Sequence, residues 1–346
     1  MIRNISALAI SSLLLACSTP ITKQTAIDQQ VSESEKAIQH ELAFQNQAKR
    51  HLRAMRVALP ILRTSAPHCG NNTAPHLGFL AYYQSQFQGD VQRAAVKHWN
   101  LTDDYKVVEI FAGSPAENAG LQKGDVIVRI NNQAVSSKQP DIRTLIAAPH
   151  TPGREIAVDI LRAGEARTLQ IPMDVVCNYP VTVVTADDVN AYADGKGIYI
   201  TSGMLRFTEN DDELATVIGH EFAHNQMDHM GKKSNNQLLG VILGAVATAV
   251  TGVDVTNLGG NLGAGAFSQD FEAEADYVGI YATARAGYDI RSAPNFWRRM
   301  GAEHPKAISH GASHPNTANR YLALDKAVKE IDEKQLLGQA LVPNLK

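Results

Sequence analysis

The residues best suited to chemistry in this chain are the pentad His220-Glu221-Phe222-Ala223-His224. On a helix, residues i and i+4 share one face, so both imidazoles can reach the same metal ion. Zinc peptidases use two histidines at this spacing, with a glutamate that takes a proton from the attacking water. The pentad predicts that His220 and His224 bind one Zn²⁺ per chain and that Glu221 is the general base. The alternative is a surface helix with solvated histidines.

The residues around the pentad predict that it lies in the middle of a helix. The segment Asn210-Asp211-Asp212-Glu213 combines an N-cap residue, an acidic first turn and a capping-box glutamate, so we expect the helix to start there. We expect it to run to Gly231, a helix-stopping residue that two lysines follow. Both histidines would then lie on rigid helical backbone.

A catalytic zinc site usually has three protein ligands, so the pentad requires another one. The best candidate is Glu272, in an acidic segment that suits a second helix packed against the first. Glu272 and Asp276 share a helical face, so Glu272 can bind the metal while Asp276 accepts the free N–H of a zinc-bound histidine. Glu274 points about 160° to 200° away and is the weaker candidate. Without the pentad, this segment would indicate only an ordinary acidic helix.

Residues 180–325 resemble the membrane-associated zinc endopeptidases that include the CAAX prenyl endopeptidase and the heat-shock protease HtpX. The resemblance rests on the pentad, on Glu272-x-x-x-Asp276, and on the segments 189–193, 197–203, 213–219, 286–289 and 313–317. It implies a gluzincin in which Glu272 binds zinc. Gln269 departs from the family, in which an arginine is common shortly before the zinc glutamate.

The same resemblance implies roles for residues outside the two helices. His314 is expected either to stabilise the oxyanion or to occupy the open metal position at rest; the alternative is a helix-capping or surface histidine. Asn190 and Ala191 resemble the family's edge strand, to which an extended substrate adds itself by main-chain hydrogen bonds. Arg320 is expected to pair with an acid near the site.

The N-terminus predicts a bacterial lipoprotein signal peptide over residues 1–16. This stretch has one charge, Arg3, and an apolar run that ends in Leu-Leu-Ala before Cys17. It resembles the lipobox, in which Cys17 is lipidated and becomes the mature N-terminus; the alternative is a short uncleaved anchor. Ser18 is not the aspartate that commonly retains lipoproteins in the inner membrane. We therefore expect a lipid anchor on the periplasmic side of the outer membrane, with residues 17–30 as a polar tether.

Two further cysteines, Cys69 and Cys177, remain in the mature chain. The periplasm is oxidising, so we expect them to form a disulfide. The chain-entropy argument gives such a long loop about 4 to 5 kcal/mol of stabilisation. The alternative is a pair of buried thiols.

Residues 76–175 have short β-rich runs separated by glycines, which predicts a separate β-rich domain. The segment from Ala112 to Ile127 closely resembles the PDZ domains of HtrA-type proteases. Leu77-Gly78-Phe79 matches the PDZ loop whose amides hold the terminal carboxylate of a peptide. Such a domain binds an extended peptide as an added strand, for substrate capture or regulation; the alternative is a structural insert.

The expected fold class is α+β, with a mainly helical zincin-type domain and a small edge β-sheet, interrupted by the β-rich PDZ domain. Residues 31–75 would form the N-terminal helical part, including a helix over residues 29–59 that Pro60 ends. The metallopeptidase domain would resume over residues 176–346. The apolar stretch 238–250 is too short to span a membrane, so we expect it to be buried or to line the cleft rather than to touch lipid.

These features predict a lipid-anchored periplasmic zinc endopeptidase that cleaves exposed or misfolded envelope proteins. Its partners would be protein or peptide substrates and the membrane. A net charge of −3 without a basic cluster argues against nucleic acid as a partner. One alternative is a chaperone or assembly factor for envelope proteins, whose zinc site is latent and gated by His314. Another is a PDZ sensor that recruits other proteases.

Overall fold

The computed structural model describes residues 22, 25–137, 142–147, 152–235, 268–303 and 318–344. The chain forms two compact units, residues 1–39 and residues 40–346. Cys17, His314 and the apolar stretch 238–250 lie outside the described residues. None of the helices in the described part is long and apolar enough to cross a membrane.

The longest element is helix α1, Gln29–Thr64, which contains Pro60 in its interior. The prediction that Pro60 ends this helix was wrong. A proline inside a helix costs about 3 kcal/mol. Ile61 and Leu62, directly after it, are buried in the hydrophobic core. Burial of such side chains contributes about 1.5 to 3 kcal/mol each, which offsets the lost backbone hydrogen bond.

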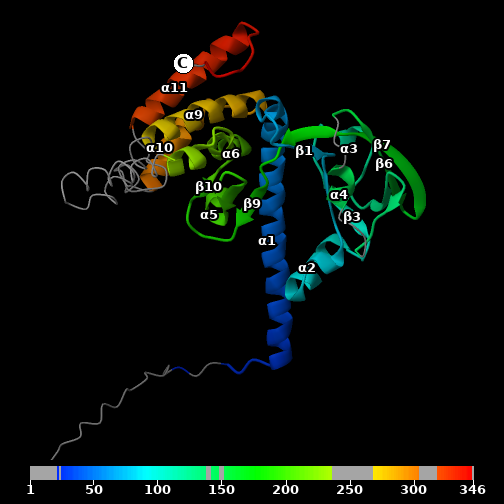
Figure 1. The fold of residues 1–346 in the computed structure, drawn as a ribbon. Helices are drawn as coiled ribbons and strands as arrows, with labels where there is room; N and C mark the ends of the chain where they lie inside the picture. Colours follow the sequence, from blue (N-terminus) through cyan, green and yellow to red (C-terminus); the bar gives the residue numbers. More distant parts are fainter. Residues whose placement is uncertain are drawn as a thin grey trace, which may run out of the picture. The chain divides into compact units, whose positions relative to one another are not determined.

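The β-rich part of the chain is built on a six-stranded antiparallel sheet (Figure 1). Its strands follow the order β2-β3-β4-β6-β7, with β5 paired to β4, so β2 lies at one edge. The strands are β2 (Phe79–Tyr82), β3 (Tyr105–Ile110), β4 (Val126–Ile130), β5 (Gln133–Ala134), β6 (Glu155–Arg162) and β7 (Glu165–Pro172). The helices between them are α2 (Gly89–Trp99), α3 (Pro115–Asn118) and α4 (Ile142–Ala147).

A two-stranded antiparallel ladder marks the point where the chain enters and leaves this sheet. Strand β1 (Thr73–His76) pairs with β8 (Asp174–Cys177), with Thr73 opposite Cys177. Cys69 and Cys177 form the predicted disulfide. Their Cα atoms are 5.7 Å apart.

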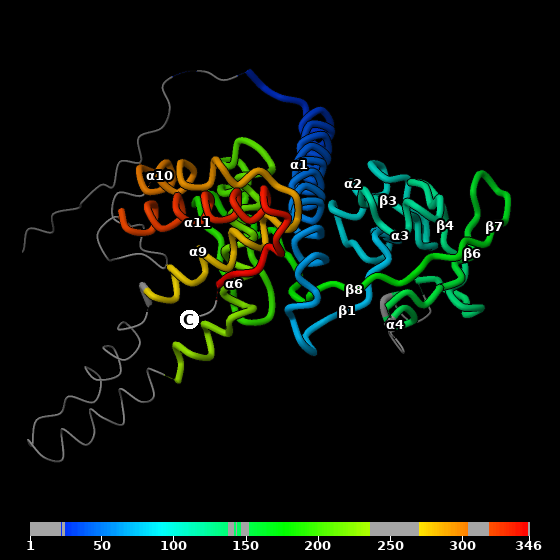
Figure 2. The backbone as a smooth tube through the Cα atoms, turned by 90° about the horizontal axis from the view of Figure 1, so that it is seen from above, coloured from blue at the N-terminus to red at the C-terminus, as the bar shows by residue number. Residues whose placement is uncertain are grey.

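The remaining strands form a small three-stranded sheet in the order β10-β11-β9. These are β9 (Val181–Val184), β10 (Ala191–Ala193) and β11 (Ile198–Thr201). Strand β10 lies at an edge and runs antiparallel to β11. Short helix α5 (Ser202–Phe207) follows β11 directly. The small sheet lies beside helix α6, as the ribbon and the tube both show (Figures 1 and 2).

Four longer helices follow the small sheet in the described part of the chain. They are α6 (Asp211–Gln226), α9 (Ser268–Arg285), α10 (Ala293–Glu303) and α11 (Ala318–Leu336). One hydrophobic core joins Val57 and Ile61 of α1 to Val217 of α6 and Tyr281 of α9. Helix α1 is thus part of the helical core, and the fold is α+β.

Candidate metal centre

Helix α6 begins at the predicted N-cap residue Asn210, but the predicted capping box is only half formed, because Glu213 accepts from the amide of Glu209 instead of that of Asn210. Asn210 Oδ1 accepts a hydrogen bond from the Glu213 amide at 2.9 Å, and Glu213 Oε2 accepts one from the Glu209 amide at 2.8 Å. The prediction that the helix runs to Gly231 was wrong, because α6 ends at Gln226. Asp228 has a φ of 51°, which breaks the helix before residues 229–235 become helical again. This left-handed turn brings the following residue back toward the pentad.

Helices α6 and α9 approach each other closely at Gly219 and Gly279. A Cβ atom on Gly219 would lie 2.7 Å from the carbonyl oxygen of Gly279, and the reverse distance is also 2.7 Å. Only two glycines permit this contact, which lies one residue before His220. One and two turns earlier on α9 are Asp276 and Glu272, so the glycine contact brings both carboxylates beside His220.

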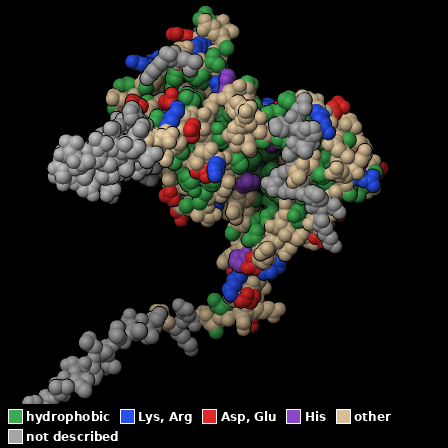
Figure 3. Space-filling model, viewed as in Figure 1, with side chains coloured by type: hydrophobic (Ala, Val, Ile, Leu, Met, Phe, Trp, Pro, Cys, Tyr) green, Lys and Arg blue, Asp and Glu red, His purple; other side chains and the backbone are tan. Residues whose placement is uncertain are grey.

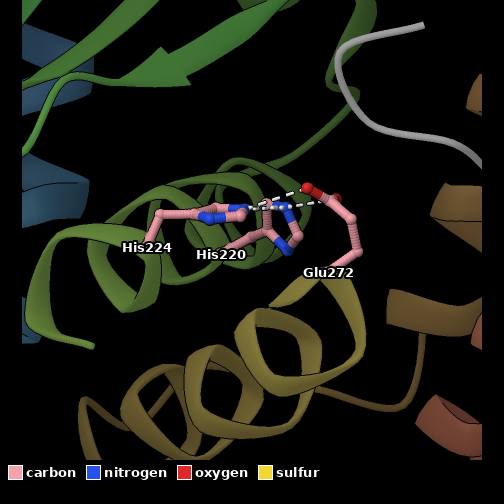
Figure 4. A group of neighbouring side chains, drawn as sticks. All are labelled: His220, His224 and Glu272. Carbon is pink, nitrogen blue, oxygen red and sulfur yellow. Dashed lines mark hydrogen bonds and ion pairs between the residues drawn. The ribbon is translucent and has the colours of Figure 1, made fainter. Parts of the chain in front are cut away.

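The side chains of His220, His224 and Glu272 converge on one point between these helices (Figure 4). Nε2 of His220 lies 3.1 Å from Nε2 of His224, and each of these atoms lies 3.4 Å from a Glu272 oxygen. For metal–ligand distances near 2.0 to 2.2 Å, the ligand atoms of a tetrahedral zinc site are about 3.3 Å apart. All three side chains are buried, so no bulk water competes for these atoms. The three residues therefore fit three of the four ligand positions of a tetrahedral zinc ion.

Asp276 and Arg320 contact the predicted ligands His220 and Glu272. Nδ1 of His220 lies 3.0 Å from Oδ1 of Asp276, close enough for a hydrogen bond after a small turn of the ring. Arg320 donates to both oxygens of Asp276, at 2.7 and 2.8 Å, and its Nη1 lies 3.2 Å from Glu272 Oε2. The structure thus places Asp276 beside His220 and Arg320 beside the acids Asp276 and Glu272.

His229 is a residue that sequence reasoning missed. Its Nδ1 lies 3.0 Å from Nδ1 of His224, its Nε2 lies 2.8 Å from Oε2 of Glu274, and its ring stacks on Phe271. Its spacing of five from His224 fits no shared helical face, so only the turn at Asp228 makes the contact. Glu274 is not among the three converging ligands, but it reaches the site through His229.

Opposing effects set the protonation of the two pentad histidines. Burial acts to lower the pKa of His220, but its contacts with Asp276 and Glu272 outweigh burial and raise the pKa to about 10. Burial lowers the pKa of His224, although Glu272 acts in the opposite direction. The two rings therefore differ in charge before a metal binds: His220 carries a proton, and His224 is neutral.

The other predicted site residues lie on separate elements. Glu221 is 2% exposed and lies between the two histidines in α6. Ala191 begins edge strand β10, and the Asn190 carbonyl accepts a hydrogen bond from the Thr201 amide at 3.1 Å. Leu77 and Gly78 lie between β1 and β2 in the β-rich part, and Phe79 begins β2.

Comparison with known proteins gives two domain matches. Residues 156–328, half of the chain, match "Peptidase family M48", and residues 95–173 match "PDZ domain". The two matches overlap over strands β6 and β7, which the structure places in the six-stranded sheet.

Two relatives illustrate the similarity. The chain is 32% identical over 132 residues to the beta-barrel assembly-enhancing protease of Yersinia pestis, covering 34% of this chain and 27% of that protein. It is 29% identical over 172 residues to the mitochondrial metalloendopeptidase OMA1 of Bos taurus, covering 44% of this chain and 33% of that protein. The chain thus spans at most 33% of the length of these two relatives.

Among solved structures, the HtrA-type protease AlgW with decapeptide matches with 24% sequence identity over 30% of each chain. Its TM-score of 0.23 is too low to support an argument about shape. The family match rests on the sequence, and the geometry of the three converging side chains agrees with it. The chain belongs to peptidase family M48 and carries a PDZ domain.

Proposed function

We propose that this protein is a zinc-dependent endopeptidase. The observation that carries the proposal is the separation of 3.1 to 3.4 Å among the ligand atoms of His220, His224 and Glu272. Membership of a peptidase family and relatives named as metalloendopeptidases support it. The remaining coordination position of a tetrahedral site would be open to water and substrate.

A zinc ion held by these residues would supply the Lewis acidity that peptide hydrolysis requires. Glu221 takes a proton from the attacking water and delivers it to the leaving amine. Its place between the two ligand histidines on one rigid helix holds the carboxylate beside the metal position. Asp276 fixes the orientation of His220.

Edge strand β10 is the proposed binding site for the substrate backbone. Among the described strands it pairs with β11 alone, and it packs beside α6. An extended peptide can therefore add to its open edge through main-chain hydrogen bonds, starting at Asn190 and Ala191. This favours unfolded or extended protein segments as substrates.

The decisive experiment replaces the general base alone. Glu221→Gln keeps the size of the side chain, so we expect normal zinc content and loss of cleavage of an unfolded protein such as reduced casein. Glu303→Gln, at an exposed position on α10, is the matched control. Retained cleavage by Glu221→Gln would contradict the proposed mechanism.

We further propose the periplasmic face of the outer membrane as the location, with Cys17 as the site of lipid attachment. The N-terminal sequence supports this, and the Cys69–Cys177 disulfide fits an oxidising compartment. Metabolic labelling with palmitate should mark the wild-type chain and leave Cys17→Ser unlabelled. Equal labelling of both chains would exclude Cys17 as the attachment site.

A second candidate function is assistance with the assembly of envelope proteins. The name of the Yersinia pestis relative, an assembly-enhancing protease, supports it. In that case the zinc site would be latent and gated by His314. The Glu221→Gln variant would then keep binding clients and support their assembly, whereas a pure protease would lose its function in cells.

A further inference from the structure

A cavity of about 610 Å³ lies between the β-rich part and helix α1. On one side it is lined by Leu77 and Phe79 and by Ile146 of α4. On the other side it is lined by Met55 and Leu59 of α1. Hydrophobic side chains gather at a hollow in this region of the surface (Figure 3). The volume lies within the range of ligand pockets, which is about 300 to 1,000 Å³.

The turn between β1 and β2 offers donors to an anion at one end of this cavity. The Leu77 carbonyl accepts from the Ala116 amide and the Gly78 carbonyl accepts from the Phe111 amide, both at 2.9 Å. Gly78 has a φ of 90°, and a Cβ there would collide with the Ser114 side chain. Within the described residues, the amides of Leu77 and Gly78 donate to no acceptor. These fixed, free N–H groups suit a carboxylate.

The open edge of β2 continues from this turn along the cavity. In the part of the chain that the structure describes, the only strand paired with β2 is β3, so a peptide can add along its other side, beginning at Phe79. Among the described residues, no Asp, Glu, Lys or Arg side chain lines the cavity. Burial is the main cause that lowers the pKa of His76, to about 4, so this lining side chain is neutral at pH 7. The occupant that fits is the free C-terminal end of a peptide with apolar last residues.

The wall opposite β2 belongs to the peptidase core. His51, Met55, Leu59 and Leu62 line the cavity at spacings of four, four and three, which places them on one face of α1. Leu59 and Leu62 also belong, with Ile61, to the hydrophobic core that contains helix α6.

We infer that α1 forms the second wall of the peptide site, so that a bound C-terminal peptide touches both the PDZ sheet and the peptidase core. The inference rests on peptide capture by the PDZ domain, and it adds Met55 and Leu59 as determinants of which peptides bind. Arg53 of α1 also holds the start of α6, donating to Asp211 Oδ1 at 2.8 Å and to the Asn210 carbonyl at 2.7 Å. The bound peptide therefore contacts the helix that anchors the zinc-binding helix.

The test measures peptide binding in the full chain carrying Glu221→Gln, so that cleavage cannot interfere. The probes are fluorescein-labelled octapeptides ending in Leu, Val or Phe, each as free acid and as C-terminal amide. We expect the best free acid to bind at least tenfold more tightly than its amide. Met55→Glu puts a charge into the apolar wall and should weaken binding at least tenfold. Leu42→Glu, on an exposed part of α1, is the matched control and should change nothing.

A second measurement does not depend on the folding of a variant. The best peptide, with benzoylphenylalanine placed two residues before its C-terminus, is photocrosslinked and the adduct is mapped by mass spectrometry. Adducts within residues 51–62 support the inference. Adducts confined to residues 77–146, or wild-type affinity in Met55→Glu, would overturn it.

These outcomes separate the inference from the proposed function. If wild-type protein cleaves nothing but the crosslink to α1 forms, the protease proposal fails and the inference stands. If it cleaves casein but shows no preference for a free carboxylate, the inference fails and the protease proposal stands.

Discussion

His224 and His229 lie ring to ring, with 3.0 Å between their Nδ1 atoms. Nε2 of His224 points to the position expected for zinc, so its proton must be on Nδ1 and is donated to His229. A neutral His229 then carries its own proton on Nε2, which it donates to Glu274 at 2.8 Å. His220 has the corresponding carboxylate, Asp276, in direct contact. Each pentad histidine is thus oriented by an acid, one of them through an intervening imidazole.

The first prediction concerns this chain of contacts. His229→Phe keeps a ring to stack on Phe271 but removes both hydrogen bonds. Loss of such an orienting partner typically lowers metal affinity about 10- to 100-fold, and we expect that loss here. Competition with a fluorescent zinc chelator measures it directly. Glu274→Gln should have a smaller effect and Glu303→Gln none; unchanged affinity in His229→Phe would exclude the orienting role.

The second prediction concerns Arg320, which is 7% exposed. Burial acts to raise the pKa of Asp276, but Arg320 outweighs it and holds the pKa below its usual value. Arg320→Met would remove one of the two cations that contact the buried carboxylates of Asp276 and Glu272, the other being protonated His220. Breaking such a buried pair costs about 3 to 5 kcal/mol in unfolding free energy. Urea unfolding with a chelator present measures this cost. Added zinc should reduce it, and an equal loss with and without zinc would contradict the electrostatic explanation.

The third prediction concerns the glycine contact between α6 and α9. Where a helix has room for a Cβ atom, Gly→Ala stabilises the folded protein by about 0.4 to 1 kcal/mol. A destabilising effect therefore indicates that the helices are in close contact at that glycine. Because a Cβ on Gly219 would lie 2.7 Å from the Gly279 carbonyl, we expect Gly219→Ala to destabilise the fold by about 1 to 3 kcal/mol. We also expect weaker zinc binding, since α9 carries Glu272. A stabilised variant with normal zinc affinity would show that the helices do not meet there.

The fourth prediction concerns pH. Burial is the main cause that lowers the pKa of His76, to about 4, while the unfolded chain titrates near the model value of 6.5. Between these values the unfolded state therefore binds more protons than the folded state. The contribution of His76 to stability is fully present above pH 6.5 and is lost as the pH falls toward 4. Since His76 is only partly buried, we expect a loss of about 1 to 2 kcal/mol. His76→Gln should lack this component when unfolding is compared at pH 7 and pH 4.5. Parallel pH profiles for the two proteins would contradict the assignment.

The fifth prediction concerns the disulfide, whose cysteines are 108 residues apart in the sequence. The chain-entropy argument gives a loop of this length about 4 to 5 kcal/mol, so Cys69→Ser with Cys177→Ser should lower the unfolding free energy by that amount. Urea unfolding measures it. Wild-type protein unfolded with a reducing agent should match the double variant, and a change below about 1 kcal/mol would mean that the link constrains the unfolded chain little.

Much of the candidate site was predictable from local sequence. Helical periodicity places His220 and His224 on one face and separates Glu272 from Glu274, and these arguments need only the 3.6-residue repeat. The N-cap at Asn210 is equally local. The β-rich composition of residues 76–175 likewise indicated a separate module, although its boundaries stay predictions.

Tertiary contacts decided the rest. Helix α1 continues through Pro60 because burial of Ile61 and Leu62 in the core offsets the cost of the proline. Local sequence rules do not include this burial. His229 reaches His224 through one left-handed residue, Asp228, and Arg320 reaches Asp276 across 44 positions of sequence. The sequence by itself determined which side chains could bind a metal, because their spacing is a property of a single helix. Only the folded chain decided which residues hold those ligands in place and which helix lines the cavity beside β2. Both depend on the packing of segments that are distant in the sequence.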